Sequence, residues 1–230
     1  MTNTNLLIIE AHSDDSAISS TAFINKLYNE GYTPHFYLAA VSSMKLHHSG
    51  HLTRKQRMNE YKNFVNSMNG IWEYEKFKPI DAESKLDTIP KADIVAEIEK
   101  IISDVRPKKL ILQGPSFHHD HTIVYESAIA ATRPTARFVP DEIYIMENPT
   151  YVHSLGPSTD FKPNFYVTMN EKEINNKLSI FKNNFPTQIR ETGNCLSPEG
   201  IKSWARYRGI EARAEYAEAY VLYRLITKSN

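Results

Sequence analysis

The sequence predicts an α/β fold in which a Rossmann-like, mainly parallel sheet is flanked by helices. Short apolar runs alternate with helical stretches along the 230 residues, and this alternation is typical of parallel sheets with helical connections. The apolar runs lack regular polar positions, which indicates strands that are buried on both faces. Polar clusters directly follow two of these runs, as expected where ligands bind beyond the carboxyl ends of strands.

The individual elements follow from local patterns. Residues 5–10 (NLLIIE) form the first predicted strand, and apolar residues then recur at helical spacing over 18–28, before a stop at Gly31. The second strand is predicted at 35–41, and the polar loop at 42–55 is expected to border a site or act as a lid. Further helices are predicted at 56–68, 91–105, 122–132, 171–185 and 216–226, and further strands at 109–112, 142–146 and 165–169.

Composition indicates a folded, soluble protein without an anionic polymer as partner. Hydrophobic residues make up 41% and charged residues 23%, as in ordinary globular chains. Lys plus Arg and Asp plus Glu both count 27, so no bulk charge favours nucleic acid. The single cysteine Cys195, the lack of a basic leader and the lack of a long apolar run predict a cytoplasmic protein without an integral membrane segment. We expect one domain over 1–230, in which the region after about residue 148 could form a smaller lobe.

Two polar clusters carry the chemistry, and each follows a predicted strand. The first is His12-Ser13-Asp14-Asp15 and the second is His118-His119-Asp120-His121. Catalytic zinc is typically bound by three imidazole or carboxylate ligands, with an open position for water. Alternatively, the aspartates cap the following helices and the histidines make ordinary polar contacts. Two such clusters at strand ends of one sheet favour a shared metal site.

These segments resemble a known family. IIEAHSDD resembles the AHPDD(E) signature of the LmbE-like, or PIG-L, deacetylases, and FHHDH is similar to their second signature. Arg57 and Glu60 resemble the family's RxxE pair, and Arg208 with Gly209 and the segment 217–219 resemble its C-terminal RG and AEAF-like motifs. The resemblance spans nearly the whole chain and implies an LmbE-like α/β fold.

The resemblance also implies roles for the clustered residues. It implies three metal ligands, namely His12, Asp15 and His121. It makes Asp14 the general base and His118 the histidine that assists the transition state. In protonated form, His118 would stabilise the oxyanion and then donate a proton to the departing amine. Asp120 is suited to orienting an imidazole, whereas His119 occupies a variable position and is left out. Arg57 either binds a polar substrate group or pairs with Glu60 one helical turn away.

The implied function is removal of an N-acetyl group from an amino sugar, or from a glycoside or sugar nucleotide that contains one. Zn²⁺ is the expected cofactor, although the same donors admit iron or manganese. Hydrolysis of another small amide is an alternative, and the departures Ser13 and Ser16, where the family has proline and often glutamate, suggest a non-catalytic sugar- or nucleotide-binding protein as another. A dinucleotide enzyme is poorly supported because no GxGxxG follows the first strand. The oligomeric state is open, and a homo-oligomer is compatible with the sequence.

Overall fold

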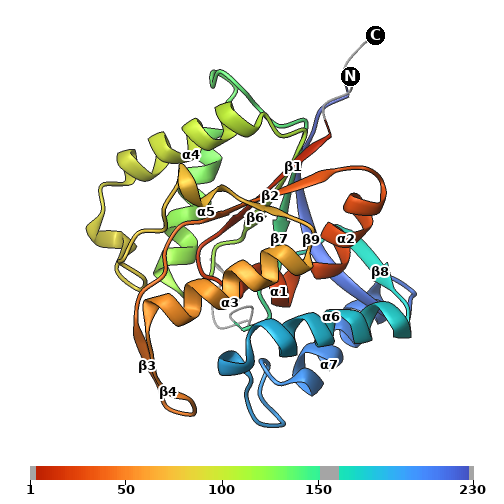
Figure 1. Cartoon of the computed structure of the whole chain (residues 1–230). Coiled ribbons are helices and arrows are strands. Elements are labelled where there is room, and N and C mark those ends of the chain that lie inside the picture. Colours follow the sequence, from red (N-terminus) through yellow and green to blue (C-terminus); the bar gives the residue numbers. More distant parts are fainter. Residues whose placement is uncertain (1–3, 151–160, 228–230) are drawn as a thin grey trace.

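A seven-stranded sheet forms the centre of the computed structural model, which describes residues 4–150 and 161–227 (Figure 1). Its strand order is β5-β2-β1-β6-β7-β9-β8. The pairings β5 to β2, β2 to β1, β1 to β6 and β6 to β7 are parallel, whereas β9 is antiparallel to β7 and β8. The strands are β1 (Asn5–Glu10), β2 (Thr33–Leu38), β5 (Ile71–Trp72), β6 (Lys109–Gln113), β7 (Glu142–Met146), β8 (Phe165–Met169) and β9 (Tyr216–Leu225). The predicted mainly parallel α/β fold is confirmed.

Helices cover both faces of the sheet and explain the uninterrupted apolar strands. In β1, Leu6 and Ile8 belong to one hydrophobic core, and Leu7 and Ile9 belong to the other. Helices α4 and α5 cover the second core, and the remaining helices cover the first (Figure 1). The helices are α1 (Asp15–Ser19), α2 (Thr21–Asn29), α3 (Arg54–Ser67), α4 (Lys91–Val105), α5 (His119–Ala131), α6 (Glu171–Asn184) and α7 (Pro198–Glu211). Successive side chains of a strand point to opposite faces, so both faces of β1 must be apolar.

Most predicted helices and strands are present, but the C-terminal segment forms a strand where a helix was predicted. Residues 216–226 were expected to be helical, and this prediction was wrong because Tyr216–Leu225 forms strand β9. The alanine-rich start of this segment favours a helix locally. Pairing with β7 on one side and β8 on the other, together with burial of Tyr220, outweighs that local preference.

The predicted loop at 42–55 contains a small hairpin, and one helix was missed. Strands β3 (Met44–Leu46) and β4 (Gly50–Leu52) pair with each other and project from the body (Figure 1). Helix α7 was not predicted, since its two glycines weaken the helical signal. Its start is nevertheless encoded by Ser197, whose side chain accepts from Gly200 N, and by Pro198 in the first turn.

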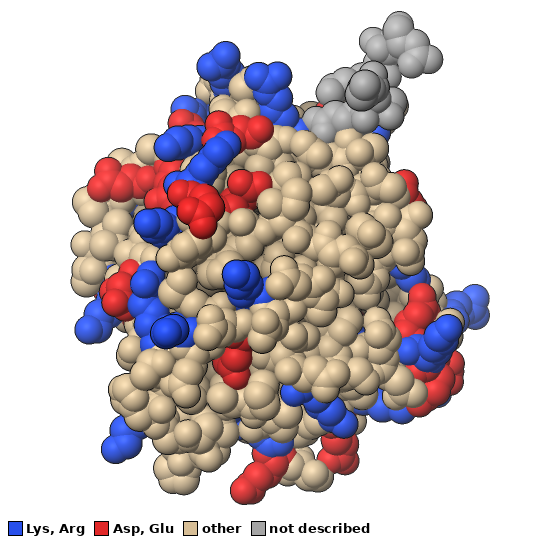
Figure 2. All heavy atoms as spheres, in the orientation of Figure 1, with Lys and Arg blue, Asp and Glu red and all other residues tan. Residues whose placement is uncertain are grey.

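The strands after residue 148 belong to the same sheet as the N-terminal ones. Strands β8 and β9 continue the sheet beyond β7, and a single domain stays our prediction. Among the described residues, no helix combines the length and the apolar character needed to span a membrane. Figure 2 shows cationic and anionic side chains interspersed on one face, with broad uncharged areas between them. On this face, positive and negative side chains are therefore mixed and do not form two separate patches of opposite charge.

Helix α7 packs closely on β9, and we predict that Gly209→Ala destabilises the protein by about 1–3 kcal/mol. A methyl group at this position would lie 2.7 Å from both Glu215 O and Tyr216 Cα, so backbone must move. Urea unfolding of wild type and variant measures the difference. Ile210→Ala is the matched control on the same helix, because Ile210 is 67% exposed. Equal stability of the two variants would contradict this close packing.

Candidate metal centre

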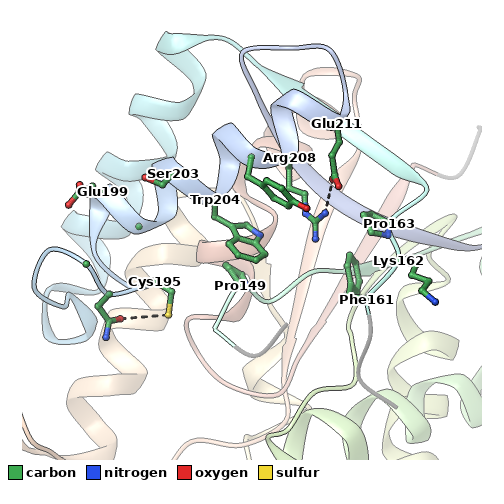
Figure 3. A pocket seen from close by; sticks show the side chains of 14 residues that line it. Pro149, Phe161, Lys162, Pro163, Cys195, Glu199, Ser203, Trp204, Arg208 and Glu211 are labelled. Carbon is green, nitrogen blue, oxygen red and sulfur yellow. Dashed lines mark hydrogen bonds and ion pairs between the residues drawn. The ribbon is translucent and has the colours of Figure 1, made fainter. Parts of the chain in front are cut away.

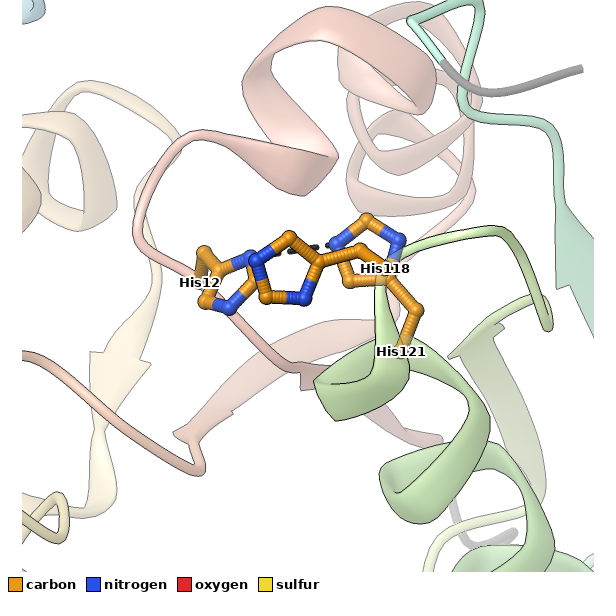
Figure 4. A group of neighbouring side chains, drawn as sticks. All are labelled: His12, His118 and His121. Atoms are coloured by element: carbon orange, nitrogen blue, oxygen red, sulfur yellow. Dashed lines mark hydrogen bonds between the residues drawn. The ribbon is translucent and has the colours of Figure 1, made fainter. Parts of the chain in front are cut away.

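Two loops far apart in the sequence meet at the carboxyl ends of β1 and β6. His12 follows β1, and His118 and His121 lie at the start of α5 after β6 (Figure 4). Nδ1 of His12 lies 3.0 Å from Nε2 of His121. The three imidazoles offer nitrogen atoms that all lie within 4.8 Å of one another. The predicted convergence of His12 and His121 is therefore present in the structure.

Asp15 adds a carboxylate to this cluster. Its Oδ1 lies 3.5 Å from Nε2 of His121 and accepts from Nδ2 of Asn148 at 3.1 Å. Its Oδ2 accepts from the backbone N–H of His12 at 2.9 Å. The carboxylate is thus fixed by two neighbours and directed at the same nitrogen as His12.

The spacing of these donors fits a metal ion. Zinc–nitrogen and zinc–oxygen bonds of about 2.0–2.1 Å in tetrahedral geometry place ligand atoms about 3.3 Å apart. The separations of 3.0 Å between His12 and His121 and 3.5 Å between His121 and Asp15 lie on either side of that value. His118 offers a further nitrogen to the same space. Imidazole and carboxylate donors suit zinc and also other divalent metals.

The outer nitrogens of the two facing histidines are held by other residues. Nε2 of His12 lies 3.1 Å from Oδ2 of Asp120, and Nδ1 of His121 lies 2.8 Å from Oγ of Ser116. Asp120 is fully buried and accepts from the backbone N–H groups of Ser84 at 2.6 Å and Leu86 at 3.0 Å. Such contacts set the tautomer and the ring orientation of metal-binding histidines. Asp120 contacts the ring of His12, and its orienting role stays a prediction.

The electrostatics of the cluster favour charge on His12. Burial favours the neutral ring, but the hydrogen bond to Asp120 and the nearby carboxylates of Asp15 and Glu83 raise the pKa of His12 to about 9. Burial raises the pKa of Asp15 to about 7, and burial together with the charge of His12 lowers the pKa of His121. Metal ligands must be deprotonated. A metal cation that replaces the proton on His12 would supply the positive charge that the carboxylates of Asp15, Glu83 and Asp120 now stabilise.

Residues 7–132 match the model of the PIG-L family, described as GlcNAc-PI de-N-acetylase. The chain belongs to this family. No curated protein matches it in a sequence comparison. The family match contains both polar clusters, strand β6 and residues 7–10 of strand β1, and it confirms the resemblance derived from the sequence.

Solved structures with low sequence identity share the whole fold. The 4-carboxy-2-hydroxymuconate hydratase from Pseudomonas putida KT2440 is 17% identical, with 99% of each chain covered and a TM-score of 0.75. The A40926 pseudoaglycone deacetylase is 16% identical over 98% of this chain and 100% of that chain, with a TM-score of 0.73. The N,N'-diacetylchitobiose deacetylase from Pyrococcus horikoshii is 15% identical over 94% and 82%, with a TM-score of 0.69. At these identities the likeness establishes the fold alone.

Asp14, the general base implied by the PIG-L resemblance, stands at the start of α1 without capping it. It occupies the N-cap position, but its side chain makes no capping hydrogen bond. Capping was the alternative interpretation of the carboxylates, and it does not apply to Asp14. Burial raises the pKa of Asp14, while the charges of Arg57 and His12 oppose the rise. A carboxylate with a raised pKa is better matched to proton transfer near neutral pH.

His118 differs from the expectation of a protonated imidazole. Its side chain caps α5, and Nδ1 accepts from the backbone N–H of Asp120 at 3.3 Å. Burial and the charge of His12 lower the pKa of His118 to about 4. The ring is therefore neutral at pH 7 and carries its proton on Nε2, which lies 3.4 Å from Oγ of Ser84. In this state His118 donates a hydrogen bond rather than a proton.

Arg57 pairs with a residue that the sequence did not indicate. Its guanidinium is buried against Glu83, with Nη2 2.8 Å from Oε1, and Nη1 also donates to the backbone oxygen of Ser42 at 3.0 Å. The alternative pair with Glu60 was wrong, because Glu60 accepts from Oγ1 of Thr187 at 2.8 Å. Substrate binding by Arg57 stays a prediction, and its charge still acts on Asp14.

The sequence analysis did not identify several residues that hydrogen-bond to the metal centre. It also did not identify a buried carboxylate beside Ser16, where the family commonly has glutamate. Ser116 and Asn148 follow β6 and β7 closely, so the rule that polar residues gather at strand ends could have found them. Ser84 lies in an irregular segment without any local signal. Beside Ser16, which replaces the common glutamate, the buried carboxylate of Glu10 accepts from Ser16 N at 2.9 Å.

We predict that His121→Ala abolishes stoichiometric zinc binding, because it removes the nitrogen that faces both His12 and Asp15. Isothermal titration of the metal-free protein with zinc measures the loss. His119→Ala is the control, since the side chain of His119 is 50% exposed and lies outside the donor cluster. Retained binding of one zinc by the His121 variant, or its loss in the His119 variant, would contradict this assignment.

Proposed function

We propose that this chain is a zinc-dependent hydrolase that removes the N-acetyl group from an amino sugar, or from a glycoside or sugar nucleotide that contains one. The observation that carries the proposal is the convergence of three donor atoms: His121 Nε2 lies 3.0 Å from His12 Nδ1 and 3.5 Å from Asp15 Oδ1. Next to them in the chain stands Asp14, whose carboxylate makes no capping hydrogen bond. Membership of the PIG-L family supplies the reaction class.

The proposed metal ligands are His12, Asp15 and His121. A bound zinc ion supplies Lewis acidity, which lowers the pKa of water and polarises an amide carbonyl. Asp120 holds His12 in the orientation that this role requires. Asn148 holds Asp15, and Ser116 holds His121. The chain thus provides each ligand with a partner that fixes its direction before any substrate binds.

Asp14 carries out the proton transfers, and His118 stabilises the negative charge that develops on the acetamide oxygen. Asp14 accepts a proton from the attacking water, which its raised pKa favours. The neutral His118 donates its Nε2–H to the oxygen that becomes negative in the tetrahedral intermediate. The proton held by Asp14 then passes to the departing amine. The low pKa of His118 makes Asp14 the better source of that proton at neutral pH.

A second candidate is addition of water to another small substrate. A hydratase shares the fold over 99% of both chains, so the fold admits water chemistry other than amide hydrolysis. Acetate release separates the two candidates, because a hydratase forms no acetate from an N-acetyl sugar. The family match favours the deacetylase.

The zinc-loaded protein is expected to release acetate from N-acetylglucosamine or its glycosides, and a chelator is expected to abolish the release. In the same assay, Asp14→Asn should retain zinc and lose at least about 100-fold in kcat, the usual contribution of general acid–base catalysis. Acetate assays combined with metal analysis measure both quantities. Turnover that survives metal removal, or a near-normal rate in the Asp14 variant, would contradict the mechanism.

His118→Ala should lower kcat by about 100- to 1000-fold, as expected for loss of one donor to an oxyanion, while zinc stays bound. Its pH profile should lack an inflection near the pKa of about 4 that burial gives His118 in the wild type. Loss of zinc from this variant would instead make His118 a ligand. His118→Gln, which keeps an N–H donor, should restore part of the rate.

A further inference from the structure

The last residue of β1 places a carboxylate on an apolar face of the sheet. Leu6 and Ile8 point into one hydrophobic core, and the alternation of side chains along a strand directs Glu10 to the same side. The side chain of Glu10 is completely buried. Burial of a carboxylate costs free energy unless hydrogen bonds replace its contacts with water. The partners of Glu10 therefore indicate its role.

Two groups of the protein donate hydrogen bonds to Glu10. Oε1 accepts from the backbone N–H of Ser16 at 2.9 Å, and Oε2 accepts from the hydroxyl of Tyr61. Tyr61 lies on α3 and is also completely buried. Figure 3 shows the hollow of about 960 Å³ beside α7, and neither Glu10 nor its two partners line it. Glu10 therefore serves other residues of the chain rather than a ligand.

The N–H of Ser16 belongs to the first turn of α1, where a capping side chain normally accepts. Asp14 occupies the N-cap position, and Ser16 is the second residue of the helix. An N-cap side chain accepts from the second or third helical residue. Glu10 therefore supplies, from strand β1, the acceptor that the N-cap residue would otherwise provide.

The backbone of Asp14 differs from that of the residues that cap other helices. Thr53, Asn170 and Ser197 have extended backbone, with ψ of 150°, 177° and 153°, and each side chain accepts from the third residue of its helix. Asp14 has a ψ of −4° and makes no capping hydrogen bond. With Glu10 in the capping role, Asp14 need not adopt the extended conformation that turns a capping side chain toward its helix.

We propose that Glu10 is a positioning residue, which caps α1 from β1 and thereby leaves the carboxylate of Asp14 available to the metal centre. This inference rests on the proposed function, in which Asp14 is the general base. Without Glu10, the N–H of Ser16 loses its acceptor, and the backbone at Asp14 becomes extended so that its carboxylate caps α1. The carboxylate then faces the helix instead of the attacking water.

Amide hydrogen exchange tests the capping assignment without turnover. Asp14→Ala should leave the exchange rate of the Ser16 amide unchanged in the otherwise wild-type protein, because Glu10 is the acceptor. In the Glu10→Ala background, the same substitution should raise that rate about fivefold, the effect of losing a cap. Faster exchange on Asp14→Ala alone, or no effect in the Glu10→Ala background, would overturn the proposal.

Glu218→Ala provides the matched control background. Glu218 is another buried carboxylate that accepts from the first turn of a helix, since its oxygens bond the backbone N–H groups of Ala22 and Phe23 in α2 at 2.9 Å. In this background Asp14→Ala should leave Ser16 exchange unchanged. An equal acceleration in the Glu10→Ala and Glu218→Ala backgrounds would reject a specific role of Glu10.

Kinetics test the consequence for the reaction. Glu10→Ala should lower kcat for acetate release by about 10- to 100-fold, with zinc bound and KM unchanged, because Asp14 is displaced. In the Asp14→Asn background it should change kcat by less than about twofold, since the two residues act as a unit. Glu10→Gln keeps an oxygen that accepts from Ser16 and should retain most of the rate. Equal losses in both backgrounds, or a Gln variant as slow as the Ala variant, would refute the positioning role.

The two sets of measurements separate failure of this inference from failure of the proposed function. The expected exchange pattern without acetate release from any sugar would overturn the proposed reaction and leave the capping role of Glu10. Acetate release together with faster Ser16 exchange on Asp14→Ala alone would overturn the capping role and leave the reaction. If Glu10→Ala does not fold, Glu10→Leu fills most of the same volume without an acceptor and gives the same test.

Discussion

The parallel pairing of β1 with β6 is the constraint on which the site depends. Its register places Ile9 opposite Leu112, so the two strands end side by side at one edge of the sheet. The chain then leaves β1 through His12 and leaves β6 toward His121. Residues 109 positions apart in sequence thereby come within 3.0 Å. A different strand between β1 and β6 would separate them by about 5 Å more for each added strand.

Around this meeting point, hydrogen bonds connect the buried polar side chains of the centre to other segments of the chain. Asp120 links His12 to the irregular segment that holds Ser84 and Leu86. Asn148 links Asp15 to the end of β7, where Glu147 also anchors α7 through Arg208. Buried polar groups are stable only when they are paired. The donors at the centre are therefore fixed by segments from several parts of the chain.

The fold admits more than one reaction, so the local residues decide the chemistry. A hydratase and two deacetylases share this architecture at 15–17% identity. What favours amide hydrolysis is the combination of the family match, the facing donors, and a carboxylate with a raised pKa beside them.

The sequence by itself determined the layered α/β fold and the two polar clusters at the ends of neighbouring strands. These features follow from local composition and from the rule that parallel strands end at one edge. The tertiary structure alone decided that 216–226 contains strand β9, that Arg57 pairs with Glu83, and that burial lowers the pKa of His118. Each of these depends on partners or burial supplied by distant segments. Local propensity carries no information about such partners, whereas packing in three dimensions fixes them.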